Sequence, residues 1–228
     1  MSLTVFDGCI EVLQQAPLLE IYSIQLCWMN SLPPIPKIFV RHTRLQTLKL
    51  FQFPFELLCG FLEVLELPSL QAYHLQAPND DIAVDNVISL LNHSGVDLKQ
   101  LTLDVHQPQL EDIKKLLNAV PSLQILHLNF CCAANGPVIR ELFEHLFSSM
   151  PIGDISGFLP TLRCLTISGW KISIWECTPC LFSSPHRKLL RLEVNKRSDI
   201  KIEKDTLRTI LRLVDEGFNI RIFEGRCS

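Results

Sequence analysis

Apolar residues recur along the chain in a short pattern that skips two positions and then one. The stretch PSLQILHLNFC, residues 121–131, has leucine at positions 123, 126 and 128. This L-x-x-L-x-L pattern, with conservative exchanges, predicts a stack of similar structural units. It forms seven leucine triplets, which are Leu19/Tyr22/Ile24, Leu45/Leu48/Leu50, Leu70/Tyr73/Leu75, Leu98/Leu101/Leu103, Leu123/Leu126/Leu128, Leu162/Leu165/Ile167 and Leu189/Leu192/Val194.

Between the triplets, the apolar spacing changes to that of an amphipathic helix. The segment LEDIKKLLNAV places Leu110, Ile113, Leu116, Leu117 and Val120 on one helical face. NVISLLNHSG and DTLRTILRLVDEG show the same spacing. Their closing glycines, Gly95 and Gly217, suit the left-handed conformation that often ends a helix. Each unit is therefore predicted to run strand, turn, helix, turn, with an eighth strand over residues 218–223.

A single unit of this kind has an apolar strand side and an apolar helix face with nothing to bury them against. Neighbouring units must stack, and bulky helices beside narrow strands bend the stack into an arc. We expect an α/β solenoid of about seven repeats plus a C-terminal capping unit, with a parallel sheet on the concave side and helices on the convex side. Residues 1–228 are predicted to form one domain. Proline and glycine in 148–160 indicate a surface loop inserted after a helix over 138–147.

Units of about 26 residues with this pattern resemble leucine-rich repeats. Cys27 after YSIQL and Cys131 after LHLNF match the cysteine-containing subclass that is common in F-box proteins. The wider texture, with APLLE, LPTLRCLTISGW and LRLVDEGFNIRI, is similar to the repeat region of the fungal F-box/leucine-rich-repeat proteins. In that family the F-box docks on an adaptor of a cullin ubiquitin ligase, and the repeats capture the substrate. The resemblance implies a protein-binding module that acts as the substrate-recognition part of a ubiquitin-ligase adaptor.

The F-box itself is not found in this sequence. Only 18 residues precede the first triplet position, Leu19, and they fit the helix of the first repeat. The chain is then a fragment, a truncated paralogue or a protein that has lost its F-box. The alternative function is a structural role, or no independent role.

Composition and charge narrow the classes of partner. The 21 basic and 24 acidic residues are not gathered into blocks, which argues against nucleic acid and anionic membranes as partners. The N-terminus lacks the basic region of a signal peptide, and no uncharged run approaches the ~18 residues that span a bilayer. Nine cysteines without framework spacing favour buried thiols in a reducing compartment. We expect a monomer, located in the cytoplasm or nucleus, that binds a protein.

Two groups of residues invite a metal or redox interpretation. Cys177 and Cys180 have the spacing of a zinc half-site or a redox pair, but only Cys164 and His186 could complete a zinc site. Incidental buried cysteines are the simpler interpretation. His74 and His127 share one repeat position, yet they are expected two strands apart, about 10 Å, so a shared metal is disfavoured.

No phosphate-binding glycine loop, Ser/His/Asp group or carboxylate pair stands out in the sequence. We therefore expect no catalytic, cofactor-binding or metal-binding residue, no cofactor and no enzyme activity.

The residues between the triplet positions are the candidate binding residues. On a strand, alternation sends the leucines into the core and the intervening residues onto the concave face. The alternative is a solvated sheet face that is polar only for solubility. The predicted protein-binding set is Ser23, Lys49, Phe51, His74, Gln76, Gln100, Thr102, Asp104, His127, Asn129, Thr166, Arg191 and Glu193.

Overall fold

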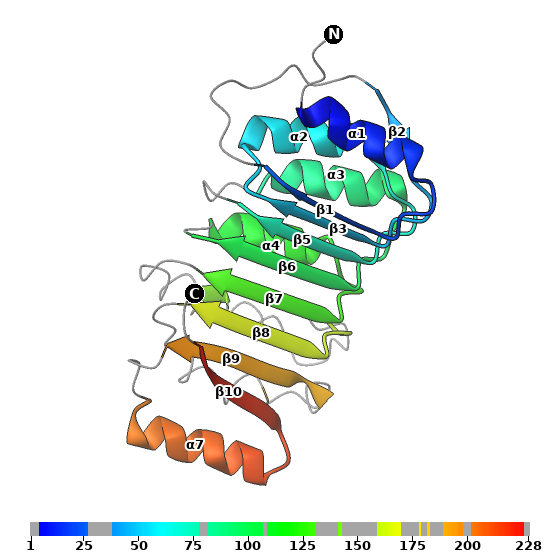
Figure 1. Cartoon of the computed structure of the whole chain (residues 1–228). Helices are drawn as coiled ribbons and strands as arrows, with labels where there is room; N and C mark the ends of the chain where they lie inside the picture. The colour runs from blue at the N-terminus through cyan, green and yellow to red at the C-terminus, as the bar shows by residue number, and fades with distance from the viewer. Residues whose placement is uncertain are drawn as a thin grey trace.

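The structure, a computed structural model, describes residues 5–26, 38–77, 82–106, 109–130, 141–142, 159–169, 178, 182, 189–197 and 202–225. The described part of the chain contains both strands and helices (Figure 1). The main strands are β1 (Ile21–Gln25), β3 (Thr47–Phe51), β5 (Ala72–Gln76), β6 (Gln100–Val105), β7 (Ile125–Phe130), β8 (Cys164–Gly169), β9 (Arg191–Arg197) and β10 (Asn219–Gly225). The helices are α1 (Val5–Gln15), α2 (Phe55–Glu63), α3 (Val84–Ser94), α4 (Leu110–Asn118) and α7 (Lys204–Asp215).

The main sheet of the described region has eight strands, and its strand order follows the order of the chain. Every neighbouring pair is parallel. Helices α2, α3 and α4 stack behind this sheet (Figure 1). The prediction of an α/β fold with a parallel sheet is therefore confirmed, and so is the eighth strand near the C-terminus.

The strand register follows the leucine triplets. The second triplet positions form one row across the sheet, which Ile220 of β10 continues. This row is Tyr22, Leu48, Tyr73, Leu101, Leu126, Leu165, Leu192 and Ile220. The residue at the start of each inner strand, from β3 to β9, adds a second ladder, in which for example the Gln71 amide donates to the Gln46 carbonyl and the Lys99 amide to the Gln71 carbonyl. The units of these inner strands therefore dock on the preceding ones through their turns as well as their strands.

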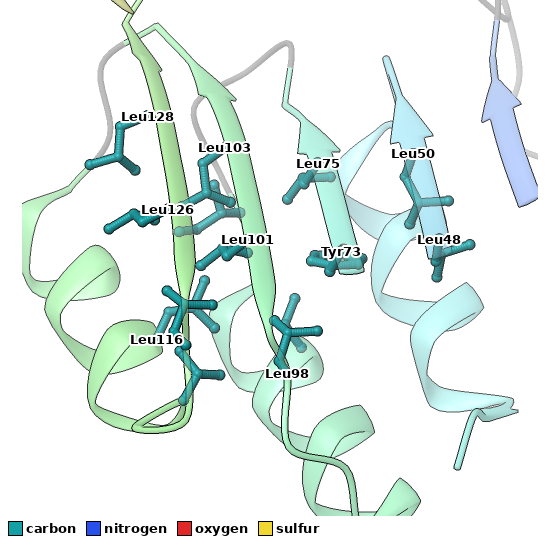
Figure 2. Close-up of a cluster of buried hydrophobic side chains, with 14 of the residues drawn as sticks. Leu48, Leu50, Tyr73, Leu75, Leu98, Leu101, Leu103, Leu116, Leu126 and Leu128 are labelled. Atoms are coloured by element: carbon teal, nitrogen blue, oxygen red, sulfur yellow. The ribbon is translucent and has the colours of Figure 1, made fainter. Parts of the chain in front are cut away.

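The core lies between the sheet and the helices. Figure 2 shows the triplet side chains of four neighbouring strands on the same side of the sheet. Leu48, Leu101, Leu126 and Leu165 are fully buried, as predicted. Burying one such side chain stabilises the fold by about 1.5–3 kcal/mol, so the repeated pattern explains why the units stay together.

The helices end where the sequence predicts. Helix α4 buries Ile113, Leu116 and Leu117 against the sheet. Gly95 closes α3 with a φ of 63°, and Gly217 follows α7 with a φ of 94°. Both angles lie in the left-handed region that side chains with a Cβ seldom adopt.

One triplet position was assigned wrongly. Leu189 was expected in the core but is 86% exposed, whereas Leu190 is fully buried. Leu190 stands two residues before Leu192, so the strand alternation points it inward and leaves Leu189 outside.

The structure also contains a small second sheet on the helix side that the sequence pattern did not predict. It consists of β2 (Val40–Arg41) and β4 (Leu65–Glu66), which pair in parallel.

Several predicted features fall outside the described residues. The helix over 138–147 is described only at Glu141 and Leu142, and the inserted loop over 148–160 only at its last two residues. The cysteines at 27, 131, 177 and 180 and the histidine at 186 also lie outside.

Candidate interaction face

The sheet side opposite the core carries the predicted binding residues. We call it the polar face. The residues between the triplet positions form three parallel rows across it. The middle row is Ser23, Lys49, His74, Thr102, His127, Thr166, Glu193 and Arg221. The strand register therefore brings all the predicted residues together on one side of one sheet.

The residues of this face differ in their exposure. Ser23 is exposed, and most of the others are partly exposed. Thr166 departs from the prediction, because its residue surface is only 8% exposed. Its neighbours Cys164 and Glu193 contact its hydroxyl and shield it from solvent. Thr166 therefore contacts other side chains of the face and is not accessible to a binding partner.

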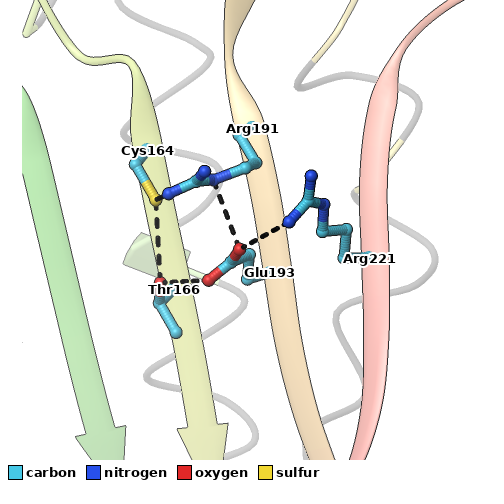
Figure 3. Close-up of polar contacts among 5 residues, drawn as sticks. All are labelled: Cys164, Thr166, Arg191, Glu193 and Arg221. Atoms are coloured by element: carbon cyan, nitrogen blue, oxygen red, sulfur yellow. Dashed lines mark hydrogen bonds and ion pairs between the residues drawn. The ribbon is translucent and has the colours of Figure 1, made fainter.

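The polar side chains over β8, β9 and β10 are paired with one another (Figure 3). The Thr166 hydroxyl donates a hydrogen bond of 3.3 Å to a Glu193 carboxylate oxygen. Arg191 Nε lies 3.2 Å from the other oxygen of Glu193, and Arg221 lies 3.9 Å from that same oxygen. Glu193 is thus neutralised by two guanidinium groups.

The Cys164 thiol belongs to this paired group. Arg191 Nη2 donates to Cys164 Sγ at 3.4 Å. This hydrogen bond, together with the nearby charge of Glu193, raises the pKa of Arg191. On the next row, Asn195 donates to the Ser168 hydroxyl at 2.8 Å. This end of the polar face therefore pairs most of its polar groups with one another, although the buried Arg191 Nε meets Glu193 as an ion pair without making a hydrogen bond.

A second pair lies over β5 and β6. His74 Nε2 is 3.0 Å from Asp104 Oδ2, and the two residues come from neighbouring strands. The Phe51 ring packs edge-on against the His74 ring, with centroids 4.8 Å apart. These contacts hold the His74 imidazole in one orientation.

His127 lies between the two paired groups. Burial lowers its pKa, and the nearby charges of Glu193 and His74 act in opposite directions on it. The imidazole is therefore neutral at pH 7, with one ring nitrogen that donates and one that accepts.

Several side chains on the central strands make no hydrogen bond or ion pair with other described residues. Those on β5, β6 and β7 are Gln76, Gln100, Thr102, His127 and Asn129, which we call the docking centre. They are primary amides, a hydroxyl and a neutral imidazole, so each can both donate and accept. The docking centre therefore offers uncharged hydrogen-bonding groups to another molecule.

The polar face has no metal centre among the residues described. His74 and His127 lie on β5 and β7 with Thr102 of β6 between them, as the sequence predicted. No group of three histidine, cysteine or acidic side chains in the described region could hold a metal ion.

Four residues in the contacts of this face were not in the predicted set, namely Cys164, Ser168, Asn195 and Arg221. Cys164 and Ser168 flank Thr166 at alternate positions of β8, so the strand alternation alone could have placed them on this face. Arg221 was missed because the eighth strand has no leucine triplet to set its register.

A pocket of about 320 Å³ lies away from the polar face, between α1 and β2. Its lining includes His42, Phe39 and Leu13. The Leu45 amide donates to His42 Nδ1, so the proton sits on Nε2, which donates to the Ala16 carbonyl at 3.0 Å. His42 has both ring nitrogens engaged and holds the backbone in place, so it offers no group to a ligand.

The fold defines an α/β protein with a parallel, solenoid-like sheet. Comparison with protein-family models, curated proteins and solved structures finds no match to this chain. Within the described region, none of the helices has the length and apolar character needed to cross a membrane.

Proposed function

We propose that this chain is a leucine-rich-repeat module that captures a protein partner on its polar face. The repeat assignment is supported by the triplets, whose second positions fall into one row of the parallel sheet. In this proposal the chain has seven repeats, which are followed by the helix-strand unit of α7 and β10. A stack of this kind presents one extended face to a partner.

The observation that carries the proposal is the contrast between the two parts of the polar face. Over β8–β10 the polar side chains bond to one another. Over β5–β7, among the described residues, His74 and Asp104 form one pair, and the docking-centre side chains around it make no hydrogen bond or ion pair. A face that is polar only for solubility would not need this difference, in which the side chains over β8–β10 bond to one another and those of the docking centre do not. The partner therefore docks over β5–β7, with Phe51 at the margin of the contact.

The chemistry of the docking centre indicates how the partner is held. Each hydrogen bond that replaces a bond to water contributes about 0.5–1.5 kcal/mol, so several together give measurable affinity. Because the donors and acceptors of the docking centre are uncharged, capture depends only weakly on salt concentration.

The test compares two triple variants of the full chain. Proximity labelling in the native cell first identifies a partner, and the purified partner is then titrated with each variant. Replacing His74, Thr102 and His127 with alanine should weaken capture by about 2 kcal/mol or more, since interface energy is concentrated in central residues. Thermal stability should stay nearly unchanged, because substitutions at partly exposed positions seldom affect folding strongly.

The matched control changes Lys114, Asn118 and Arg208 on the helix side to alanine. This variant should bind as the unaltered chain does. If the helix-side variant loses the partner while the polar-face variant keeps it, the docking surface lies on the helices or loops and the proposal is wrong.

Within this proposal, the chain serves as the substrate-recognition part of an F-box-type ubiquitin-ligase adaptor. The support for this role is the resemblance of the repeat pattern to the fungal F-box/leucine-rich-repeat proteins. The described N-terminal helix α1 buries Ile10 and Leu13 in the repeat core, so it is not free to act as an F-box helix. The chain alone should therefore not co-elute with the cullin adaptor on size exclusion, and stable co-elution would show that α1 has been misinterpreted.

The second candidate function is a structural role without a partner of its own. The uncharged polar side chains of the docking centre would also be suitable for a sheet face that contacts only water. Failure to enrich any protein by proximity labelling, in cells where the chain is abundant, would favour it.

A further inference from the structure

The two outer strands of the sheet leave the core partly open. In the six inner strands, the inward residues at the second and third triplet positions are at most 1% exposed. On the outer strands, the corresponding Tyr22 of β1 and Ile220 and Ile222 of β10 are only partly buried. A strand on each side is needed to close these rows, and β1 and β10 each have one neighbour in the sheet.

The C-terminal edge, formed by α7 and β10, also exposes apolar side chains. Ile210 and Leu213 of α7 are buried in the core. Leu207, Leu211 and Val214 continue the apolar side of the same helix, at spacings of four and three residues, and are 40–54% exposed. The arginines beside them are paired within the helix, Arg208 with Asp205 at 2.9 Å and Arg212 with Glu216 at 3.6 Å. An apolar stripe with balanced charges at its border is suited to association.

The N-terminal edge, formed by α1 and β1, has the same character. Val12 of α1 and Leu18 of the following turn are 44% and 73% exposed, and Ile21 of β1 is 59% exposed on the polar-face side of this edge strand. Both ends of the stack therefore present apolar helix surface beside a strand whose outer backbone groups have no partner in the described sheet.

The order of elements makes the two edges complementary. The described chain starts with a helix followed by a strand, α1 and β1, and closes with a helix followed by a strand, α7 and β10. Placing α1 and β1 of a second copy after β10 continues the helix-strand alternation of the stack. All strands of the main sheet run parallel, so β1 of the second copy meets β10 in the same direction as an inner neighbour does.

We propose that this chain associates head to tail, with the C-terminal edge of one copy docked on the N-terminal edge of a second. In the register of the sheet, Ile220 then lies opposite Tyr22 of the second copy and Ile222 opposite its Ile24. The stripe of Leu207, Leu211 and Val214 is covered by α1 of the second copy. The contact is heterologous, so each copy keeps one free edge and the assembly can grow beyond two copies.

The sequence alone favoured a monomer, because spacing does not show which leucines of an amphipathic helix are left uncovered. The exposed stripe of α7 is the structural reason for proposing association. The proposal is independent of any partner on the polar face, because neither edge overlaps the docking centre.

The test measures the mass of the full chain by sedimentation velocity and light scattering over about a hundredfold range of concentration. The unaltered chain should increase in average mass as concentration rises. Two variants each block one edge: Leu207→Lys with Leu211→Lys, and Val12→Lys with Leu18→Lys. All four positions are partly or largely exposed, so circular dichroism should show unchanged folding.

The two blocked variants distinguish head-to-tail association from other arrangements. Each one alone should remain a monomer, with self-association weakened by at least about tenfold, because an unpaired lysine would be buried in the contact. Mixed in equal amounts, they should form a dimer and nothing larger, since each supplies the edge that the other lacks. The control Asn118→Lys, at an exposed position of α4 in the middle of the stack, should associate as the unaltered chain does.

Three results would overturn the proposal. The first is an unaltered chain that stays monomeric over the whole concentration range. The second is a mixture of the two blocked variants that stays monomeric although both are folded. The third is association of either blocked variant by itself, which would place the contact on another surface.

Discussion

The chain's two tyrosines, Tyr22 and Tyr73, allow one substitution to be tested in two environments. They occupy the same triplet position on β1 and β5, aligned through Leu48 of β3. The Tyr22 hydroxyl donates to the Cys9 carbonyl at 3.0 Å. The Tyr73 hydroxyl is buried and has no hydrogen-bond partner among the described residues. Tyrosine to phenylalanine should therefore change stability in opposite directions at the two positions.

The size of each change in the free energy of unfolding depends on the hydrogen bonds that each hydroxyl makes in the folded and unfolded chain. A buried hydroxyl without a partner costs about 1–3 kcal/mol, because its bonds to water are not replaced. Removing the Tyr73 oxygen leaves a small void, which costs on the order of 0.3 kcal/mol. Tyr73→Phe should thus stabilise the protein by about 1–2 kcal/mol. Tyr22→Phe removes a formed hydrogen bond and should destabilise it by about 0.5–1.5 kcal/mol.

Burial agrees with this assignment, since it raises the pKa of the Tyr73 hydroxyl well above 10.0. The assay is urea unfolding of both variants beside the unaltered chain, with the midpoint as the readout and an unchanged slope as the check on two-state behaviour. In thermal melts each kcal/mol corresponds to about 2–4 °C for a chain of this size. A Tyr73→Phe variant that is destabilised as much as Tyr22→Phe would show that the Tyr73 hydroxyl is hydrogen-bonded in solution.

Two further predictions concern the core and the polar face. Leu126→Ala should lower the free energy of unfolding by about 2–5 kcal/mol because it opens a cavity in a fully buried row, whereas Leu189→Ala should change it by less than about 0.5 kcal/mol; equal losses would contradict the assigned register. Burial lowers the pKa of His127 below its usual value of 6.5. As the pH falls below 6.5, the unfolded chain therefore takes up a proton at this residue before the folded chain does, and the free energy of unfolding decreases. An NMR titration midpoint for His127 at or above 6.5 would contradict this, and His127→Gln should reduce the acid sensitivity of folding.

Much of the fold was determined by local periodicity in the sequence. The alternation along each strand identifies the inward side of Leu126 and the outward side of His127, because successive side chains on a strand point to opposite faces. The spacing of Ile113, Leu116 and Leu117 identifies a helix in the same way. Because every unit repeats the pattern, residues at equivalent triplet positions in the sequence are also the residues that pair between neighbouring strands of the sheet. Leu189 was misassigned where two leucines stand side by side and periodicity alone favours neither.

The tertiary structure decided which polar side chains meet and which edges stay open. The pairs of His74 with Asp104 and of Thr166 with Glu193 join residues 30 and 27 positions apart in the chain. Such contacts depend on side-chain rotamers and on distances between neighbouring strands, and the sequence pattern specifies neither. The burial of Thr166 and the open docking centre follow from those contacts. The exposure of Leu211 likewise depends on what packs beside α7, because the same helical spacing describes a leucine whether or not a neighbour covers it.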